Sequence, residues 1–284
     1  MILVTGAGGT TGREVVRALT QKGGKFRAFF HSEEKARRAA EAGLDAVTGD
    51  FEKPETVRRA LMGITKIFLL SPGTPDLAAR EAAVAAEAKA AGVEHLVKLS
   101  VWRASEEGFQ FARWHRQAEK AIESSGIPFT FLRPNSFMQN VVTYFLSGIR
   151  DRQAILLPAG QARISAIDVR DIAEVAVRML SGPGHQGRAY DLSGPESLSY
   201  AQVAATLSVV LGKRINYVDV PEAEAGRAML EQGAPEWMAE AFLDLQRYGR
   251  QGLASDVLGS VQQILGRKAT SFERFARDHV RAFA

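Results

Sequence analysis

Residues 1–19, MILVTGAGGTTGREVVRAL, place a glycine-rich turn between a short apolar run and a segment of helical period. Gly6, Gly9 and Gly12 recur at three-residue intervals directly after the apolar run. Glycine permits the tight turn, lets the backbone approach a pyrophosphate, and lets the following helix pack closely on the strand. The N-terminus of that helix would direct free N–H groups and a positive dipole end at the phosphates. An ordinary tight turn also contains glycine, but a strand before it and a helix after it favour a dinucleotide site.

Beyond this turn, short β-rich runs alternate with longer segments of helical period. The runs before Pro134 are nearly all apolar, as expected for central parallel strands that are covered on both faces. This alternation is typical of βαβ units in a doubly wound parallel sheet. The predicted strands of this part are residues 2–5, 26–30, 46–49, 66–70, 95–99 and 129–132, and its predicted helices are 11–22, 33–42, 54–62, 77–92 and 109–126.

After Pro134 the pattern is less regular, and we expect a smaller lobe there. Its predicted helices are residues 136–147, 169–181, 200–212, 222–232, 236–250 and 272–283, and its predicted strands are 154–157, 188–192 and 215–219. The sequence therefore predicts an α/β fold: a Rossmann-type doubly wound parallel sheet with a smaller C-terminal substrate lobe. We place the dinucleotide-binding domain at residues 1–134 with a returning segment near 163–194, and the mainly substrate-binding lobe at 135–284.

Composition restricts the kinds of site and partner. The 284 residues include no cysteine, which excludes disulfides and cysteine nucleophiles and makes a reducing cytoplasm the expected location. No apolar run reaches the roughly eighteen residues of a membrane helix, so no membrane association is expected. The net charge of +4 is spread over mixed stretches such as HSEEKARRAAE, which favours solvated helix faces over direct nucleic-acid binding. No metal site is predicted, and the oligomeric state, monomer or homodimer, stays open.

The end of the second predicted strand, AFFHSEEK, bears on the choice of nucleotide. A site for NAD(H) usually places Asp or Glu there to accept from the ribose hydroxyls, whereas the 2′-phosphate of NADP(H) needs donors and positive charge. Here His31, Ser32 and Lys35 follow the strand. Glu33 and Glu34 fall in the first turn of a helix, where the dipole favours them. NADP(H) is therefore the predicted cofactor and NAD(H) the less favoured one, unless Lys35 belongs only to a solvated helix face.

Other candidate cofactor contacts follow the carboxyl ends of the strands, where ligands bind in such sheets. They include the residues that open the helix after the glycine turn, and a possible adenine contact after the third strand. The predicted set is Gly6, Gly9, Thr10, Thr11, Gly12, His31, Ser32, Lys35, Asp50, Phe51, Leu70, Ser71, Pro72 and Ser100.

Several motifs along nearly the whole chain together resemble one protein family. They are GAGGTTG at residues 6–12, GDF at 49–51, HRQAEK at 115–120, GIPFTFLRP at 126–134, SAIDVRDIAEVA at 165–176 and TSFERFARD at 270–278. The chain resembles the NmrA-like, atypical short-chain dehydrogenases/reductases, and within them the type 2 NADPH:quinone oxidoreductase and triphenylmethane reductase group. The resemblance implies an NAD(P)-binding Rossmann fold and an oxidoreductase.

The same resemblance locates a changed catalytic pair. In ordinary short-chain dehydrogenases a tyrosine transfers a proton, and a lysine four residues later holds the nicotinamide ribose; counting back from GIPFT, these positions fall on Phe111 and His115. None of the five tyrosines has a lysine four residues after it, and Phe111 cannot transfer a proton. We expect His115 to bind the cofactor ribose or to relay a proton, with Glu119 orienting it from one turn away. The candidate catalytic residues are thus His115 and Glu119, although each could be an ordinary helix residue.

The predicted substrate contacts follow the sixth and fifth strands. The stretch RPNSFMQNVVTYF offers Asn135, Phe137 and Met138 where the family places the floor of its substrate cleft. Apolar side chains with a few amides suit a flat, conjugated, weakly polar molecule. Trp102 could stack on an aromatic ligand. Phe137 and Met138 could equally be core residues.

Two functions are compatible with these features. The first is an NADPH-dependent reductase that passes hydride directly to a conjugated or cationic small molecule, such as a quinone, dye, iminium or enone, without the usual Tyr/Lys pair. The alternative is a non-catalytic NADP(H)-sensing regulatory protein of the NmrA type, which would bind a protein partner. A regulator that binds DNA directly is disfavoured, because the sequence shows neither a helix-turn-helix signal nor a basic patch.

The residues after the second strand predict that NADPH binds at least several-fold more tightly than NADH. The preference should shrink as salt rises, because a contact between a phosphate and a cation is screened. Fluorescence titration with both nucleotides at two ionic strengths measures this, and equal affinities at low salt would contradict it.

Overall fold

The computed structural model describes residues 1–283, which form two compact units. The first unit comprises residues 1–106, 112–133 and 169–191. The second comprises residues 107–111 and 134–168, together with the chain from residue 192 onward. None of the helices in residues 1–283 combines the length and the apolarity that crossing a membrane requires.

A seven-stranded sheet forms the centre of the first unit, and its strand order is β3-β2-β1-β4-β5-β6-β9. The strands are β1 (Ile2–Val4), β2 (Phe26–Phe30), β3 (Ala46–Thr48), β4 (Lys66–Leu69), β5 (His95–Leu99), β6 (Phe129–Pro134) and β9 (Arg188–Leu192). β1 pairs in parallel with both β2 and β4, and the pairs β2–β3, β4–β5 and β5–β6 are also parallel. The direction of winding reverses between β1 and β4, which is the switch point where dinucleotides bind in such sheets.

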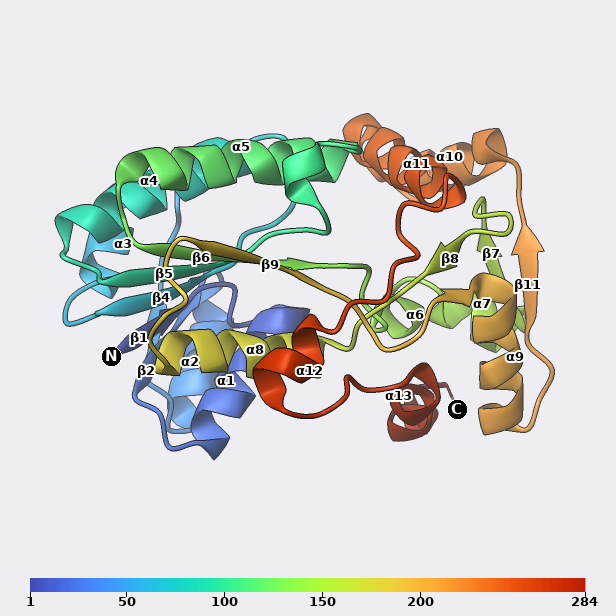
Figure 1. Ribbon diagram of the computed structural model, residues 1–284, viewed down its shortest axis with the longest axis horizontal. Coiled ribbons are helices and arrows are strands. Elements are labelled where there is room, and N and C mark those ends of the chain that lie inside the picture. Colours follow the sequence, from blue (N-terminus) through green and yellow to red (C-terminus); the bar gives the residue numbers. More distant parts are fainter. Residues whose placement is uncertain (284) are drawn as a thin grey trace. The chain divides into compact units, whose positions relative to one another are not determined.

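Helices cover both faces of this sheet (Figure 1). One face carries α3 (Pro54–Ala60), α4 (Leu77–Ala90) and α5 (Gln110–Ser125), and the other carries α1 (Thr10–Gln21), α2 (Glu33–Glu41) and α8 (Val169–Ser181). Apolar side chains of the strands and of α3, α4 and α5 form one buried cluster that includes Leu3, Ile67, Val84, Leu96 and Phe131. The predicted doubly wound α/β sheet is confirmed, because each predicted strand before Pro134 is present at its predicted place.

The second unit is built from short strands and helices around a core of its own. Its strands are β7 (Ala154–Leu157), β8 (Arg163–Ile164), β10 (Leu198–Ser199) and β11 (Asn216–Asp219), paired as β7 with β11 and β8 with β10. Its helices are α6 (Asn140–Thr143), α7 (Leu146–Asp151), α9 (Tyr200–Leu211), α10 (Glu222–Glu231), α11 (Glu236–Arg250), α12 (Ser260–Leu265) and α13 (Phe272–Asp278). Residues such as Met138, Ile155, Leu207 and Phe275 form its buried core.

Two helix predictions of this part are wrong in detail. The predicted helix 136–147 is replaced by the two short helices α6 and α7. The first begins only at Asn140, because Phe137 forms a β-bridge with Ile167 and its neighbour Met138 donates its backbone N–H to Ile167 O at 2.9 Å. The predicted helix 272–283 ends at Asp278, and a 3₁₀ turn over Val280–Phe283 follows it. The short α12 was not predicted.

The close packing of α1 on the turn after β1 generates a stability prediction. A Cβ at Gly12 would lie 2.0 Å from Gly6 O, so Gly12→Ala should force the helix away and lower the free energy of unfolding by about 2 kcal/mol or more. At Gly9 a Cβ would lie 3.3 Å from the same oxygen, so the control Gly9→Ala should cost less than about 1 kcal/mol. Urea denaturation of both variants measures the difference, and equal losses would contradict the packing argument.

Candidate functional site

The glycine turn has the geometry that a pyrophosphate needs. Gly6 adopts a φ of +60°, which glycine reaches without steric cost, and Gly9 N–H donates to Gly6 O at 2.9 Å. Thr5 ties the turn to the adjacent strand end, since its Oγ1 donates to Leu70 O at 2.9 Å and accepts from Leu70 N–H at 2.8 Å. Gly9 is exposed and precedes the first residue of α1, and no side chain in residues 1–283 caps this helix. The first-turn N–H groups of α1, including those of Thr10 and Thr11, are therefore oriented for an anion.

The residues that follow β2 present donors and a cation beside this turn. His31 is exposed, and Ser32 caps α2 by accepting a hydrogen bond from Lys35 N–H at 3.3 Å. Glu33 and Glu34 occupy the first turn of α2, as predicted. The stem of Lys35 lies over the glycine turn, because a Cβ added at Gly8 would meet Lys35 Cδ at 3.2 Å. These groups fit the 2′-phosphate of NADP(H).

Two further predicted cofactor contacts, Asp50 and Phe51, follow β3, and each contacts a nearby residue of the first unit. Asp50 is half-buried, and its Oδ1 accepts from Glu52 N–H at 3.0 Å. Phe51 packs on Phe29 with ring centroids 5.5 Å apart. Their predicted role as cofactor contacts stays a prediction.

A buried ionic network lies beside the carboxyl ends of β4 and β5. Lys98 on β5 is 0% exposed, and its Nζ lies 2.5 Å from Oε2 of the equally buried Glu81 on α4. Ser71, which comes just after β4 and before the exposed Pro72, donates to Glu81 Oε1 at 2.8 Å. Burial raises the pKa of Glu81, and both Lys98 and Ser71 oppose this rise.

The ammonium of Lys98 also determines which ring nitrogen of His115, on α5, carries the proton. Lys98 Nζ lies 3.1 Å from His115 Nδ1, and lysine has donors but no acceptor, so Nδ1 must be the unprotonated nitrogen. Burial, and then the positive charge of Lys98, hold the pKa of His115 well below its ordinary value near 6.5. The imidazole is therefore neutral at pH 7 and carries its proton on Nε2. Within residues 1–283 this Nε2 has no hydrogen-bond partner, so it can donate to a bound molecule.

Glu119 does not orient His115, which corrects the expectation drawn from their spacing. Its carboxylate is 0% exposed and accepts from Arg133 Nε at 2.9 Å, Arg133 Nη2 at 2.7 Å and Ser100 Oγ at 2.7 Å. Arg116 adds a contact at 3.1 Å. Burial alone would raise the pKa of Glu119, but the hydrogen bonds from Arg133 and Ser100 lower it below its ordinary value. An ionised carboxylate with its oxygens occupied is suited to structural support rather than proton transfer.

Two of the predicted substrate contacts, Trp102 and Asn135, are buried and contact other residues of the chain. Trp102 is 2% exposed, and Arg103 lies over its ring at 5.3 Å, so the ring offers no open face for the predicted stacking on a ligand. Asn135 is buried, and its Nδ2 donates to Ser165 Oγ at 2.9 Å and to Ala254 O at 2.8 Å. Its Oδ1 accepts from the backbone N–H of Ser136, so both ends of the amide already make hydrogen bonds within the fold.

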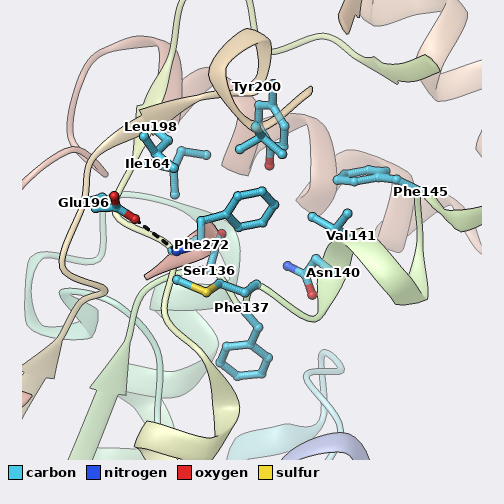
Figure 2. A pocket seen from close by; sticks show the side chains of 13 residues that line it. Ser136, Phe137, Asn140, Val141, Phe145, Ile164, Glu196, Leu198, Tyr200 and Phe272 are labelled. Carbon is cyan, nitrogen blue, oxygen red and sulfur yellow. Dashed lines mark hydrogen bonds between the residues drawn. The ribbon is translucent and has the colours of Figure 1, made fainter. Parts of the chain in front are cut away.

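Phe137 and Met138 line an apolar pocket of the second unit (Figure 2). The pocket is formed by residues of the segment 136–145 together with residues near β8, β10, α9 and α13. Met138 is 3% exposed and belongs to the core of this unit, whereas the ring of Phe137 points away from the other labelled side chains. The hydroxyl of Tyr200 points into the pocket, where burial raises its pKa.

The profile of the NmrA-like family matches residues 1–276. The chain belongs to the NmrA-like family. The resemblance drawn from the sequence motifs is thus confirmed.

Three reductases are similar to the chain over nearly its full length. It is 38% identical to the NAD(P)H azoreductase of Xenophilus azovorans, over 100% of this chain and 99% of that protein. The triphenylmethane reductase of Citrobacter sp., solved in complex with NADP(H), has a TM-score of 0.85 and 27% identity, covering 98% of this chain and 99% of that one. The NADPH-dependent quinone oxidoreductase QOR2 of Escherichia coli, solved with NADPH, has a TM-score of 0.88 and 26% identity, with the same coverages.

Three charged residues of the site were missed by the sequence analysis: Glu81, Lys98 and Arg133. Two of them could have been recognised from the sequence, because Lys98 is a charged residue in the apolar run HLVKL and Arg133 ends the run FTFLR. A charge in a central strand that is covered on both faces must have a buried partner. Searching for that partner would have led to the glutamates of the neighbouring helices.

Gly9→Val should nearly abolish NADPH binding and leave the chain folded. Gly9 has a φ of −86°, so a side chain causes no backbone strain, but a branched Cβ would occupy the approach to the first turn of α1. We expect at least about a ten-fold loss of affinity by fluorescence titration, with an unchanged circular dichroism spectrum. A folded variant with normal NADPH affinity would show that the turn does not hold the pyrophosphate.

His115 should act as a neutral donor and not as a titrating acid. His115→Ala should weaken NADPH binding about five-fold, which corresponds to one hydrogen bond of about 1 kcal/mol. Because its pKa is depressed, the imidazole stays neutral as pH falls from 8 to about 6, and kcat of the unmodified protein should be flat over that range. An inflection between about pH 6 and 7 that disappears in the variant would instead indicate proton relay.

Proposed function

We propose that this chain is an NADPH-dependent reductase that passes hydride directly to a conjugated or cationic small molecule, such as a quinone, an azo or triarylmethane dye, an iminium or an enone. The relatives named above support the oxidoreductase class and NADP(H) as the cofactor. Azo compounds, triphenylmethane dyes and quinones share one property: each accepts hydride at a site where the adduct is stabilised by delocalisation or loses a positive charge.

The main support for this proposal is the protonation and hydrogen bonding of the two ring nitrogens of His115. Its Nδ1 faces an ammonium at 3.1 Å, so the imidazole cannot take up a proton there, and its Nε2–H is a hydrogen-bond donor. One helical turn earlier on α5, Phe111 has no proton to give. A site with a donor but no acid suits an acceptor that requires no enzymic protonation at the receiving atom.

The proposed role of each group is binding and orientation. When bound, NADPH would supply a hydride and become NADP⁺. The glycine turn and the first turn of α1 would hold the pyrophosphate, His31, Ser32 and Lys35 the 2′-phosphate, and His115 the nicotinamide ribose. A dye cation then needs only the hydride to become neutral, whereas a quinone also takes one proton from water to reach the hydroquinone. Phe137 and Met138 remain proposed contacts of the acceptor.

NADPH oxidation with a panel of quinones, azo dyes, triarylmethane dyes, enones and simple ketones tests the proposal. We expect turnover with at least one conjugated acceptor and none with the ketones, whose reduction needs a proton at the alkoxide oxygen. Phe111→Tyr should leave the rate with a good acceptor within about two-fold, because no proton from that position is required. Tight NADPH binding with a silent panel would contradict the reductase and favour an NADP(H) sensor.

A further inference from the structure

Lys98 occupies a position where an apolar residue would be expected. Its neighbours on β5, Leu96, Val97 and Leu99, are all buried and apolar, and its own side chain is 0% exposed. Removing an ammonium from water costs several kcal/mol, and a buried ion pair often adds little net stability compared with apolar side chains of similar volume. The fold of β5 therefore gives no reason for a lysine at this position.

The contacts of the ammonium point to a different role. Lys98 Nζ contacts three acceptors: Glu81 Oε2 at 2.5 Å, Leu99 O at 3.2 Å and His115 Nδ1 at 3.1 Å. The first neutralises its charge and the second belongs to its own strand. The third is the imidazole whose other nitrogen is open to a ligand.

Lysine is well suited to selecting one tautomer of that imidazole. A hydroxyl or an amide at this place could donate or accept and would allow either ring nitrogen to carry the proton, whereas an ammonium can only donate. Glu81 keeps the ammonium in place and is itself held by Ser71 at 2.8 Å. Ser71 follows β4 at the predicted cofactor edge, so a continuous chain of contacts runs from that loop through Glu81 and Lys98 to His115.

We propose that Lys98, fixed by Glu81, is a positioning residue that locks His115 as the Nε2–H tautomer and aims this N–H at the nicotinamide ribose. The proposal rests on the proposed function in one respect only, namely that His115 binds the cofactor. Lys98 itself touches neither cofactor nor substrate.

Nitrogen-15 NMR of histidine-labelled protein reads the tautomer directly, and the spectrum of His115→Ala assigns the signal. In the unmodified protein we expect a single tautomer with Nδ1 unprotonated and Nε2 protonated at pH 7. A protonated Nδ1 would overturn the proposal without any change to Lys98.

The variant test must not leave a single charge buried. Lys98→Met alone would leave the Glu81 carboxylate buried without a counter-charge. The paired change Lys98→Met with Glu81→Leu instead replaces the whole ion pair by apolar side chains, which buried sites commonly tolerate. In this double variant we expect the NMR signal of His115 to report a mixture of tautomers and NADPH affinity to fall about two-fold, which is less than the loss expected for His115→Ala because one tautomer still donates. In the His115→Ala background the same double change should leave NADPH affinity unaltered, since there is no imidazole left to position.

A folded double variant that retains one tautomer and full NADPH affinity would overturn the proposal, and so would an equal loss of affinity with and without His115. The tautomer and the affinity are measured without an acceptor. A silent acceptor panel would therefore refute the reductase and leave the positioning role intact, whereas an unchanged tautomer would refute the positioning role and leave the reductase intact.

Discussion

The burial of one ammonium group, that of Lys98, is the constraint that organises the face of the sheet covered by α4 and α5. A charge without water requires a counter-charge and a full set of hydrogen-bond partners, and Glu81, Leu99 O and His115 supply them. On α4, Glu81 therefore faces β5. On α5, His115 faces the same strand.

The arrangement is repeated one strand further along. Ser71 donates to Glu81, which pairs with Lys98 on β5, and Ser100 donates to Glu119, which pairs with Arg133 on β6. In both cases a helix carboxylate accepts a hydrogen bond from a hydroxyl just beyond one strand and pairs with a cation on the next strand. The two networks differ at the cation, since the Lys98 ammonium has a further donor for His115 whereas Arg133 also donates to Ser105. Only the first network therefore reaches the open imidazole, which explains why His115 and not Glu119 is the functional candidate.

The sequence predicted the sheet well because each strand carries its own signal, an apolar run between turns. It predicted the glycine turn for the same reason, since Gly6, Gly9 and Gly12 are close in sequence. It failed where a residue's role depends on a distant partner. The spacing of His115 and Glu119 suggested that these two side chains interact. Instead, Arg133 and Ser100 donate hydrogen bonds to the carboxylate of Glu119, and Lys98 donates to the imidazole of His115. Likewise, Phe137 is not helical as predicted, because it forms a β-bridge with Ile167, a contact that no local sequence pattern indicates.

The central claim, direct hydride transfer to an acceptor that needs no enzymic acid, is tested most directly by following the hydrogen itself. A triarylmethane dye cation is reduced with NADPH that carries deuterium on the transferred position of C4, in ordinary water, and the leuco product is analysed by mass spectrometry. The account predicts one deuterium on the central carbon of the dye, because the hydride never exchanges with solvent. A reduced dye that carries solvent hydrogen at that carbon would contradict the account.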